Sequence, residues 1–443
     1  MSTISASSSS GTSGQLGTGI DVGSTVASLM QGQRLPEQQM KTQQTQLNAQ
    51  VSALQIISTN ITALQGRIQS LADFNGPLAA RSTSTSNAGV LTGSADSTAP
   101  LGQHQIVVTG LAQTSSVYTD AVASASTPIS TGTFSIKVGS ATAVPVTIDS
   151  SNNTLAGVAA TINAANIGVS AGVITDAAGA RLSILSSSSG AAGDLTISGA
   201  VTGLNFHKAV TGADASLTVD GIPIDSATNT VAGVIPGVTL NLTGTSSGAV
   251  TFGVAADTTQ AAAAIQTFVS SYNAAIQSVN AQFAFTPGST APPLMGDSSL
   301  VMVQQQMYSA ISYSTTGNGG MNSLSDLGIS VNNDGTLTVD SSKLSGALNQ
   351  NNAAALNFFQ SAGTGFARQF NTVLGTMTDP TQGAVSVEIK GATDSVTSLQ
   401  AQITDFEARM TLIQNQLTTQ FDTVNTTLQQ MPLLLAQINS QLG

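Results

Sequence analysis

Side chains able to perform acid–base or nucleophilic chemistry are scarce in this sequence. Its 443 residues include two histidines, His104 and His207, and no cysteine. A serine nucleophile needs a placed base, and only these two histidines could serve in a histidine-based triad. A zinc site needs three or four ligands, and the sequence offers neither cysteine nor a third histidine. We therefore predict that both histidines are ordinary surface or interface residues and that the protein is not an enzyme.

Short motifs give no stronger indication of a ligand site. Gly17-Thr18-Gly19 resembles a fragment of a phosphate-binding loop, but no Lys-Ser/Thr pair follows it. Asp220-Gly221 and Asp334-Gly335 are typical of turns, because glycine tolerates the positive φ that tight turns need. Isolated Asp and Glu residues show no spacing that indicates paired carboxylates. The sequence predicts no cofactor and no metal site.

The composition indicates a protein that packs into an assembly. Charged residues make up 7% of the chain, against about 25% in average proteins, and the net charge is −11. The 11 Lys and Arg residues are spread singly, so no basic patch is available for nucleic acid or anionic membranes. In an assembly, every surface charge without a matching partner costs desolvation energy.

The elements that must position any functional surface include two long helices near the ends of the chain. Apolar residues recur every three or four positions from Leu47 to Leu71 and from Val396 to Leu442, which is typical of near-heptad amphipathic helices. We call each of these apolar patterns a stripe. The alternative interpretation of the first stripe is that it packs into a core within the same chain. The second would span roughly 70 Å, so we expect its distal part to pack against other chains. We expect Pro432 to kink or interrupt this helix near Met431.

The stripe positions are the candidate functional residues of the chain. Each would present an apolar side chain to an oligomer or filament contact. The candidates are Leu47, Val51, Leu54, Ile61, Leu64, Ile68, Ile403, Phe406, Met410, Ile413, Leu417, Phe421, Val424 and Leu428.

The middle of the chain has the texture of β structure. Between residues 81 and 257, short β-branched runs alternate with Gly, Ser, Asn and Asp, and Leu155 to Ala165 is predicted as a short helix. Helices are expected again from Thr259 and at 298–312, 341–359 and 363–374, with a hairpin around Asp334-Gly335. The predicted fold is α+β and multidomain, with terminal coiled-coil-like helices forming a leg or stalk and two small β-rich head domains inserted between them.

The predicted domain boundaries follow these changes in pattern. They are 1–37 for a disordered N-terminal export and filament-contact segment, 38–80 for the N-terminal leg helix, 81–125 with 212–257 for one head domain, 126–211 for a second head domain inserted in the first, 258–395 for a helical domain with a β-hairpin, and 396–443 for the C-terminal coiled-coil leg helix.

The first residues and the hydropathy bear on cellular location. The start, MSTISASSSSGTSGQ, has no positive or apolar region typical of a secretory signal peptide. The sequence contains no uninterrupted run of about 18 apolar residues, the length that could span a membrane. If the protein leaves the cell, we expect a route that does not read or cleave such a signal.

Five segments in order resemble the flagellar cap protein family, also called hook-associated protein 2. They are Leu16 to Val22, Leu155 to Asn163 (LAGVAATIN), Val219-Asp220-Gly221 with Ile235 to Leu240, Phe268 to Asn273 (FVSSYN) and Leu324 to Leu348, the last being the most specific. The resemblance covers nearly the whole chain.

This resemblance implies a function as well as a fold. Family members leave the cell through the flagellar type III export channel and form an extracellular homo-oligomeric ring at the distal tip of the filament. The ring prevents flagellin leakage and promotes folding and insertion of exported flagellin. The implied partners are flagellin, the hook–filament junction protein before filament growth, and a cytoplasmic export chaperone at the C-terminal helix.

Other classes remain as alternatives at the level of sequence. Another flagellar axial protein, either flagellin or a hook–filament junction protein, would share terminal heptad helices around β domains, but Leu324 to Leu348 favours the cap. A surface adhesin is supported only by the Ser/Thr/Gly-rich β region. A glycan-cleaving enzyme would need an acid–base pair that the sequence does not show.

Overall fold

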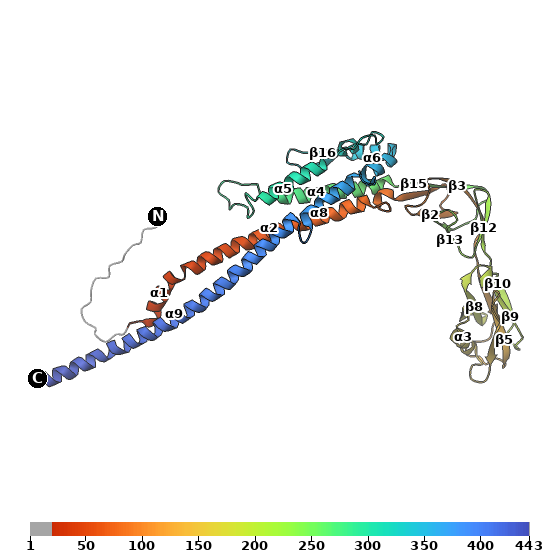
Figure 1. Cartoon of the computed structure of the whole chain (residues 1–443). Coiled ribbons are helices and arrows are strands. Elements are labelled where there is room, and N and C mark those ends of the chain that lie inside the picture. The colour runs from red at the N-terminus through yellow and green to blue at the C-terminus, as the bar shows by residue number, and fades with distance from the viewer. Residues whose placement is uncertain (1–19, 443) are drawn as a thin grey trace.

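A computed structural model describes residues 20–442 of the chain. Figure 1 shows an elongated molecule in which long helices project from one end of a helical body and β domains project from the other. The expected α+β multidomain fold is confirmed. The predicted disorder of 1–37 falls partly on residues 1–19, which lie outside the described residues. For the rest of that segment the expectation is wrong, because helix α1 spans Val22–Gln33.

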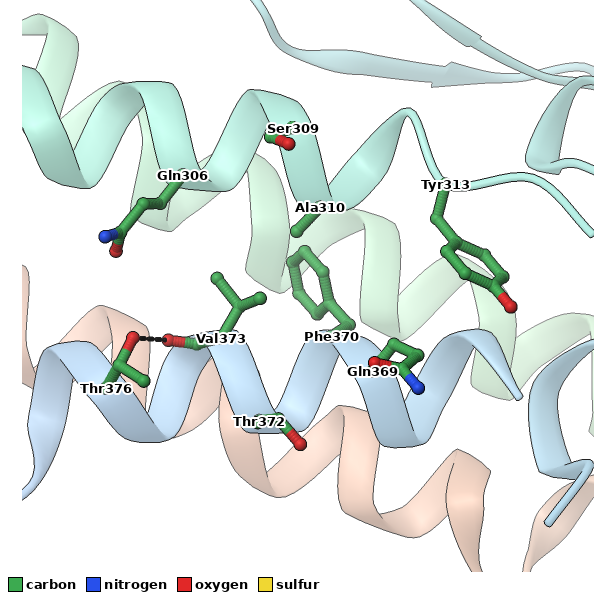
Figure 2. Close-up of a pocket in the computed structure, with 9 residues that line it drawn as sticks. All are labelled: Gln306, Ser309, Ala310, Tyr313, Gln369, Phe370, Thr372, Val373 and Thr376. Atoms are coloured by element: carbon green, nitrogen blue, oxygen red, sulfur yellow. Dashed lines mark hydrogen bonds between the residues drawn. The ribbon is translucent and has the colours of Figure 1, made fainter. Parts of the chain in front are cut away.

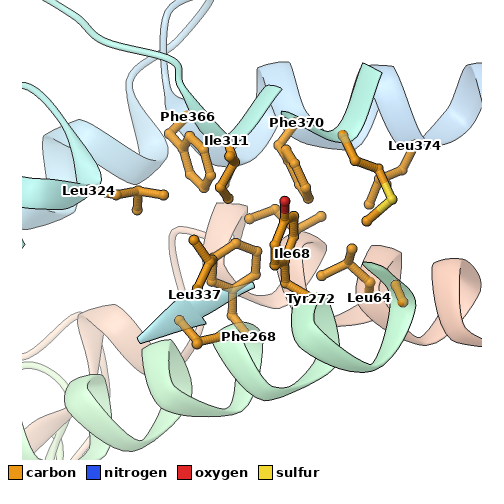
Figure 3. Packing of buried hydrophobic residues seen from close by; sticks show 14 of the residues in the cluster. Leu64, Ile68, Phe268, Tyr272, Ile311, Leu324, Leu337, Phe366, Phe370 and Leu374 are labelled. Carbon is orange, nitrogen blue, oxygen red and sulfur yellow. The ribbon is translucent and has the colours of Figure 1, made fainter. Parts of the chain in front are cut away.

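The helical body is built around the second half of helix α2. Its core joins Leu64 and Ile68 of α2 to Phe268 of α4 and Phe370 of α8 (Figure 3). The elements are α2 Leu35–Ala72, η1 Pro77–Ala79, α4 Thr258–Asn280, α5 Ser298–Ile311, η3 Leu324–Leu327, β16 Ile329–Val331, β17 Leu337–Val339, α6 Ser341–Gln350, α7 Asn352–Gln360, α8 Phe366–Thr378 and the first turns of α9 Ala384–Leu442.

Asparagine and aspartate side chains define where these helices begin. Asp257, Asp297 and Asp340 each accept backbone N–H groups in the first turns of α4, α5 and α6. Asn351 accepts the N–H of Ala354 and starts α7, so the single helical piece expected over 341–359 is two helices.

The inner head domain, residues 81–113 and 213–256, is a pair of antiparallel sheets. Their strand orders are β1-β15-β3-β11-β12 and β13-β14-β2. Phe252 and Leu91 are among the fully buried side chains between them. The strands are β1 Arg81–Thr85, β2 Leu91–Ala95, β3 Gly102–Gly110, β11 Ala215–Val219, β12 Ile222–Ser226, β13 Thr230–Ala232, β14 Val238–Leu242 and β15 Val250–Ala256.

The outer head domain, residues 114–210, has a separate core. Its sheets, ordered β10-β4-β8-β7 and β6-β5-β9, enclose the helix α3. Its elements are β4 Thr114–Thr119, β5 Gly132–Val138, β6 Val144–Ile148, α3 Leu155–Ala164, β7 Val169–Asp176, β8 Gly179–Ser189, η2 Ala191–Gly193, β9 Leu195–Ser198 and β10 Phe206–Val210.

The boundary between the head domains differs from the expected one. The predicted boundary places residues 114–125 in the first head domain, but β4 pairs with β8 and β10 and therefore belongs to the second. The chain crosses at Gln113, whose N–H donates to the carbonyl of Ala213 at 2.8 Å. Strand pairing between distant residues decides this boundary, and local periodicity carries no information about it.

The leg consists of α1, residues 35–50 of α2, and α9 from residue 396 onward. α9 begins at Ala384 rather than 396, because Val385 is buried in the core of the helical body. It also continues through Pro432 to Leu442, so the expected interruption near Met431 is wrong. Proline removes one N–H donor, and the carbonyl that loses its partner lies on an exposed part of the helix, where water can bind it.

Candidate contact surfaces of the leg

Helix α1 ends at Gln33, just before α2 begins at Leu35, and packs on α9. A continuous helix would bring the ring of Pro36 against the carbonyl of Gly32, which instead accepts the N–H of Arg34. Asp21 caps the start of α1 by accepting the N–H of Ser24 at 3.1 Å, and this hydrogen bond lowers the pKa of Asp21. Because of this break between α1 and α2, the short helix α1 packs on its own stretch of α9, the last helix of the chain.

The seam between α1 and α9 is apolar. Val26 and Met30 of α1 and Met410 of α9 are buried together, with 3%, 4% and 5% of their surfaces exposed. Side chains of α9 packed partly buried against them are Phe406, Ile413, Leu417 and Phe421. α1 therefore covers one stretch of the C-terminal stripe within the same chain.

A small ion-pair network lies where α1, α2 and α9 meet. The Glu37 carboxylate is 3.0 Å from the Arg34 guanidinium and 2.7 Å from the Lys41 ammonium, which is also 2.7 Å from Glu407 of α9. The hydrogen bond from Lys41 lowers the pKa of Glu37, and the bonds to Glu37 and then Glu407 raise the pKa of Lys41. The Lys41–Glu407 pair therefore links α2 to α9 at a solvent-exposed position, where ion pairs contribute little stability.

Beyond the seam, α9 carries its apolar stripe into solvent. From residue 424 to residue 438, large apolar side chains are 36–72% exposed. They are Val424, Leu428, Met431, Leu433, Leu434, Leu435 and Ile438. Exposed apolar positions that continue a covered seam are typical of a surface that binds a partner.

Comparison with known proteins places the chain in a family. The family models for the N-terminus and the C-terminus of flagellar hook-associated protein 2 match residues 18–115 and 212–432. B-type flagellar hook-associated protein 2 of Pseudomonas aeruginosa is 30% identical over 417 residues, which cover 87% of each chain. The chain belongs to the flagellar hook-associated protein 2 family. The resemblance seen in the sequence motifs is thereby confirmed.

Further members of the hook-associated protein 2 family agree in sequence and fold. The Escherichia coli K12 protein of that name is 27% identical, covering 95% of this chain and 96% of the relative. The crystal structure of the D1-D2-D3 domains of the flagellar cap protein from Escherichia coli matches 77% of this chain and 99% of that chain. Its TM-score is 0.60 at 24% identity, which shows a shared fold. The family forms the filament cap, and the alternative of another axial protein is not favoured.

The candidate contact residues divide into groups by burial. Leu54, Ile61, Leu64 and Ile68 are 0–1% exposed in the core of the helical body, so their interpretation as oligomer or filament contacts is wrong. α4 and α8 cover that stripe, as the alternative of an intramolecular core describes. Ile403 of α9, at 2% exposure, has no surface left for a partner either.

Other candidate contact residues remain partly exposed to solvent in this structure. Leu47, in the leg, and Val51, just after it in α2, are half-buried, and Leu47 lines a gap beside Leu399 of α9. Val424 and Leu428 are exposed, at 47% and 36%. They remain proposed contacts.

The set of contact residues predicted from the sequence omits the α1 half of the seam. Val26 and Met30 fall in the segment expected to be disordered, although their spacing of four residues is a helical signal. It also omits Leu433 and Leu434, which stand off the heptad stripe, and the Lys41 ion pairs, whose α9 partner only the fold reveals.

Both histidines pair with aspartates in the head domains. The Nδ1 atom of His104 is 2.7 Å from Asp220, and the Nε2 atom of His207 is 2.8 Å from Asp120. The His104 bond is the main cause that lowers the pKa of Asp220, whereas for Asp120 the Asn205 amide contributes more than His207. These pairs connect neighbouring strands and loops.

Turn geometry agrees with the expectation for the two Asp-Gly motifs. Asp220 and Gly221 both have positive φ, 52° and 85°, between β11 and β12, and Gly335 has a φ of 78° between β16 and β17. Within residues 20–442, no three His, Cys, Asp or Glu side chains gather closely enough to hold a metal ion. In the same range, no helix combines the length and apolar character needed to cross a membrane.

Proposed function

We propose that this chain is a subunit of an oligomeric cap at the distal tip of the bacterial flagellar filament. The cap prevents leakage of exported flagellin and promotes its folding and insertion into the growing filament. The observation that carries the proposal is membership of the hook-associated protein 2 family over nearly the full length.

The two ends of the molecule suit different tasks. The exposed stripe of α9 from residue 424 to 438 offers an apolar surface at the far end of the leg, opposite the head domains (Figure 1). Such a helix face fits a groove between axial subunits at the filament end. The head domains would then form a plate over the lumen, under which flagellin folds.

The proposed partners follow from this arrangement. They are further copies of the chain, flagellin, the hook–filament junction protein before filament growth, and a cytoplasmic export chaperone that shields the exposed end of α9. The proposed route is the flagellar type III channel to an extracellular location. The proposed cap function consists of non-covalent contacts. It therefore involves no catalytic residue, no nucleic acid and no insertion into a membrane.

Immunogold electron microscopy of intact cells tests the proposal. Antibody raised against residues 81–257 is expected to label only the distal tips of filaments, and cells lacking the chain provide the control. Label along the shaft or at the hook junction would make the protein another axial component. Label on the cell surface alone would favour an adhesin.

A further inference from the structure

A hollow lies between α5 and α8 on the surface of the helical body. It has a volume of about 380 Å³, and Figure 2 shows Phe370, Val373 and Ala310 pointing into the space between the two helices. Phe370 is buried and forms the floor, and the rim consists of amide and hydroxyl side chains such as Gln306 and Ser309. An apolar cavity of about 150 Å³ suffices to bind benzene, so this groove can hold an aromatic side chain.

An exposed phenylalanine stands on a loop of the same body. Phe285, 49% exposed, lies in the segment between α4 and α5, which projects past the N-terminal end of α5 (Figure 1). The segment is held at its ends by Phe283, partly buried against the core, and by Leu294, which is 4% exposed. Gln50 of α2 also donates a hydrogen bond to the carbonyl of Pro293 at 3.1 Å.

The loop and the groove complement each other chemically. Neither the groove lining nor residues 281–296 include a charged side chain, so contact between them desolvates no charge. Pro287, Pro292 and Pro293 have no N–H, so the loop presents an excess of carbonyl acceptors to the donors of Gln306 and Ser309. The prolines also restrict the loop before binding, which reduces the entropy cost of docking.

The loop cannot fill the groove of its own chain. The groove lies along the C-terminal half of α5, roughly 18 Å from the helix N-terminus at 1.5 Å per residue, and the loop projects in the opposite direction. We propose that Phe285 of one copy inserts into the α5/α8 groove of a second copy. Because different surfaces meet, the contact is head-to-tail, the kind that closes into a ring when its rotation permits. This inference rests on the proposed oligomeric cap and identifies a contact within it.

Surface variants with matched controls test the contact by mass measurement in solution. Phe285→Asp and Ser309→Glu are each expected to reduce the oligomer population about tenfold or more, without lowering the melting temperature. Both positions are exposed, so neither substitution disturbs the core. Val331→Asp, on the hairpin of the same body with 52% exposure, is the control and should assemble normally.

Cysteine pairing tests whether the two surfaces meet each other, since the chain has no native cysteine. Phe285→Cys mixed with Ser309→Cys is expected to give a disulfide-linked dimer under mild oxidation. Phe285→Cys mixed with Ser330→Cys, on the hairpin, is expected to give none. Equal cross-linking in both mixtures, or none with Ser309→Cys, would overturn the proposed contact.

The wild-type protein separates this inference from the proposed function. Wild-type oligomers that persist in both the Phe285 and Ser309 variants would sink the contact and leave the cap function standing. A wild-type chain that stays monomeric at every concentration would count against the oligomeric cap itself, and with it against the contact.

Discussion

At the scale of single residues, three asparagine side chains each bind both the backbone N–H and the C=O of one residue elsewhere in the chain, as a neighbouring strand would. Asn273 donates to the carbonyl of Leu337 at 2.8 Å and accepts its N–H at 2.7 Å. Asn163 makes the same two bonds to Ala171, and Asn229 makes them to Ala112. Asn163 and Asn273 are the last residues of LAGVAATIN and FVSSYN, so the backbone clamp gives these motifs a physical role.

We expect Asn273→Asp to lower the free energy of unfolding by about 1–3 kcal/mol, because a carboxylate cannot donate to the carbonyl of Leu337. Urea denaturation measures the loss. Asn48→Asp, at an exposed position of α2, is the matched control and should change stability little. Equal stability of the two variants would contradict the clamp.

Tyr272 is one of four described residues with a buried side-chain atom that lacks a hydrogen-bond partner. The hydroxyl of Tyr272 has no partner among the described residues, and burial raises the pKa of this phenol. Its ring packs 6.2 Å from that of Phe370, measured between centroids, directly under the α5/α8 groove. Its ring belongs to the aromatic cluster that Phe268, Phe366 and Phe370 form in this core.

At the scale of elements, α9 is one helix with three environments. Its first turns are part of the body core, its middle is covered by α2 and α1, and its end is exposed. Leu417 and Phe421 lie in the covered middle, so changing them would also release α1. Leu428 is the position that tests a contact with the filament alone.

Leu428→Asp is expected to weaken attachment to the filament tip about tenfold, equivalent to roughly 1.4 kcal/mol, because it places a charge in an apolar contact. Thermal unfolding should not change, since Leu428 is exposed in the free chain. Counting immunogold-labelled tips gives the occupancy. Leu412→Asp, at a 65% exposed position of α9 before the 424–438 stripe, is the control. Full occupancy with Leu428→Asp would exclude this stripe as the contact.

At the scale of the whole molecule, the outer head domain is inserted in the inner one. Hydrogen bonds join the two domains where the chain crosses between them. Gln113 and Ala213 are joined by backbone hydrogen bonds where the outer domain leaves and rejoins the inner one. The Ala191 N–H of the outer domain donates to Asp214, and the Ser189 hydroxyl donates to the carbonyl of Ala227. These hydrogen bonds connect the two domains where the chain crosses between them.

Replacing residues 114–210 by a short Gly-Gly link should leave the inner domain and the helical body folded. Gln113, at one cut end, is hydrogen-bonded to Ala213, two residues beyond the other, and the inner core shares no buried residue with the outer one. Circular dichroism should show the helical signal and a cooperative thermal transition. Loss of that transition would mean that the inner domain depends on its insertion.

The sequence by itself determined the local features of this protein. Helical stripes and Asp-Gly turns follow from residue types and near spacing, and the α+β order of segments follows from them. These features depend on interactions within a few residues. The family motifs could also be recognised without a structure.

Tertiary structure alone decided what each surface meets. The same heptad pattern runs through Leu64 and Leu428, yet one lies under α4 and α8 and the other is exposed, because burial depends on distant elements. The turn of α1 onto Met410 and the pairing of β4 with β8 join residues far apart in the chain. A periodic pattern shows that a face is apolar, and only the fold selects the element that covers it.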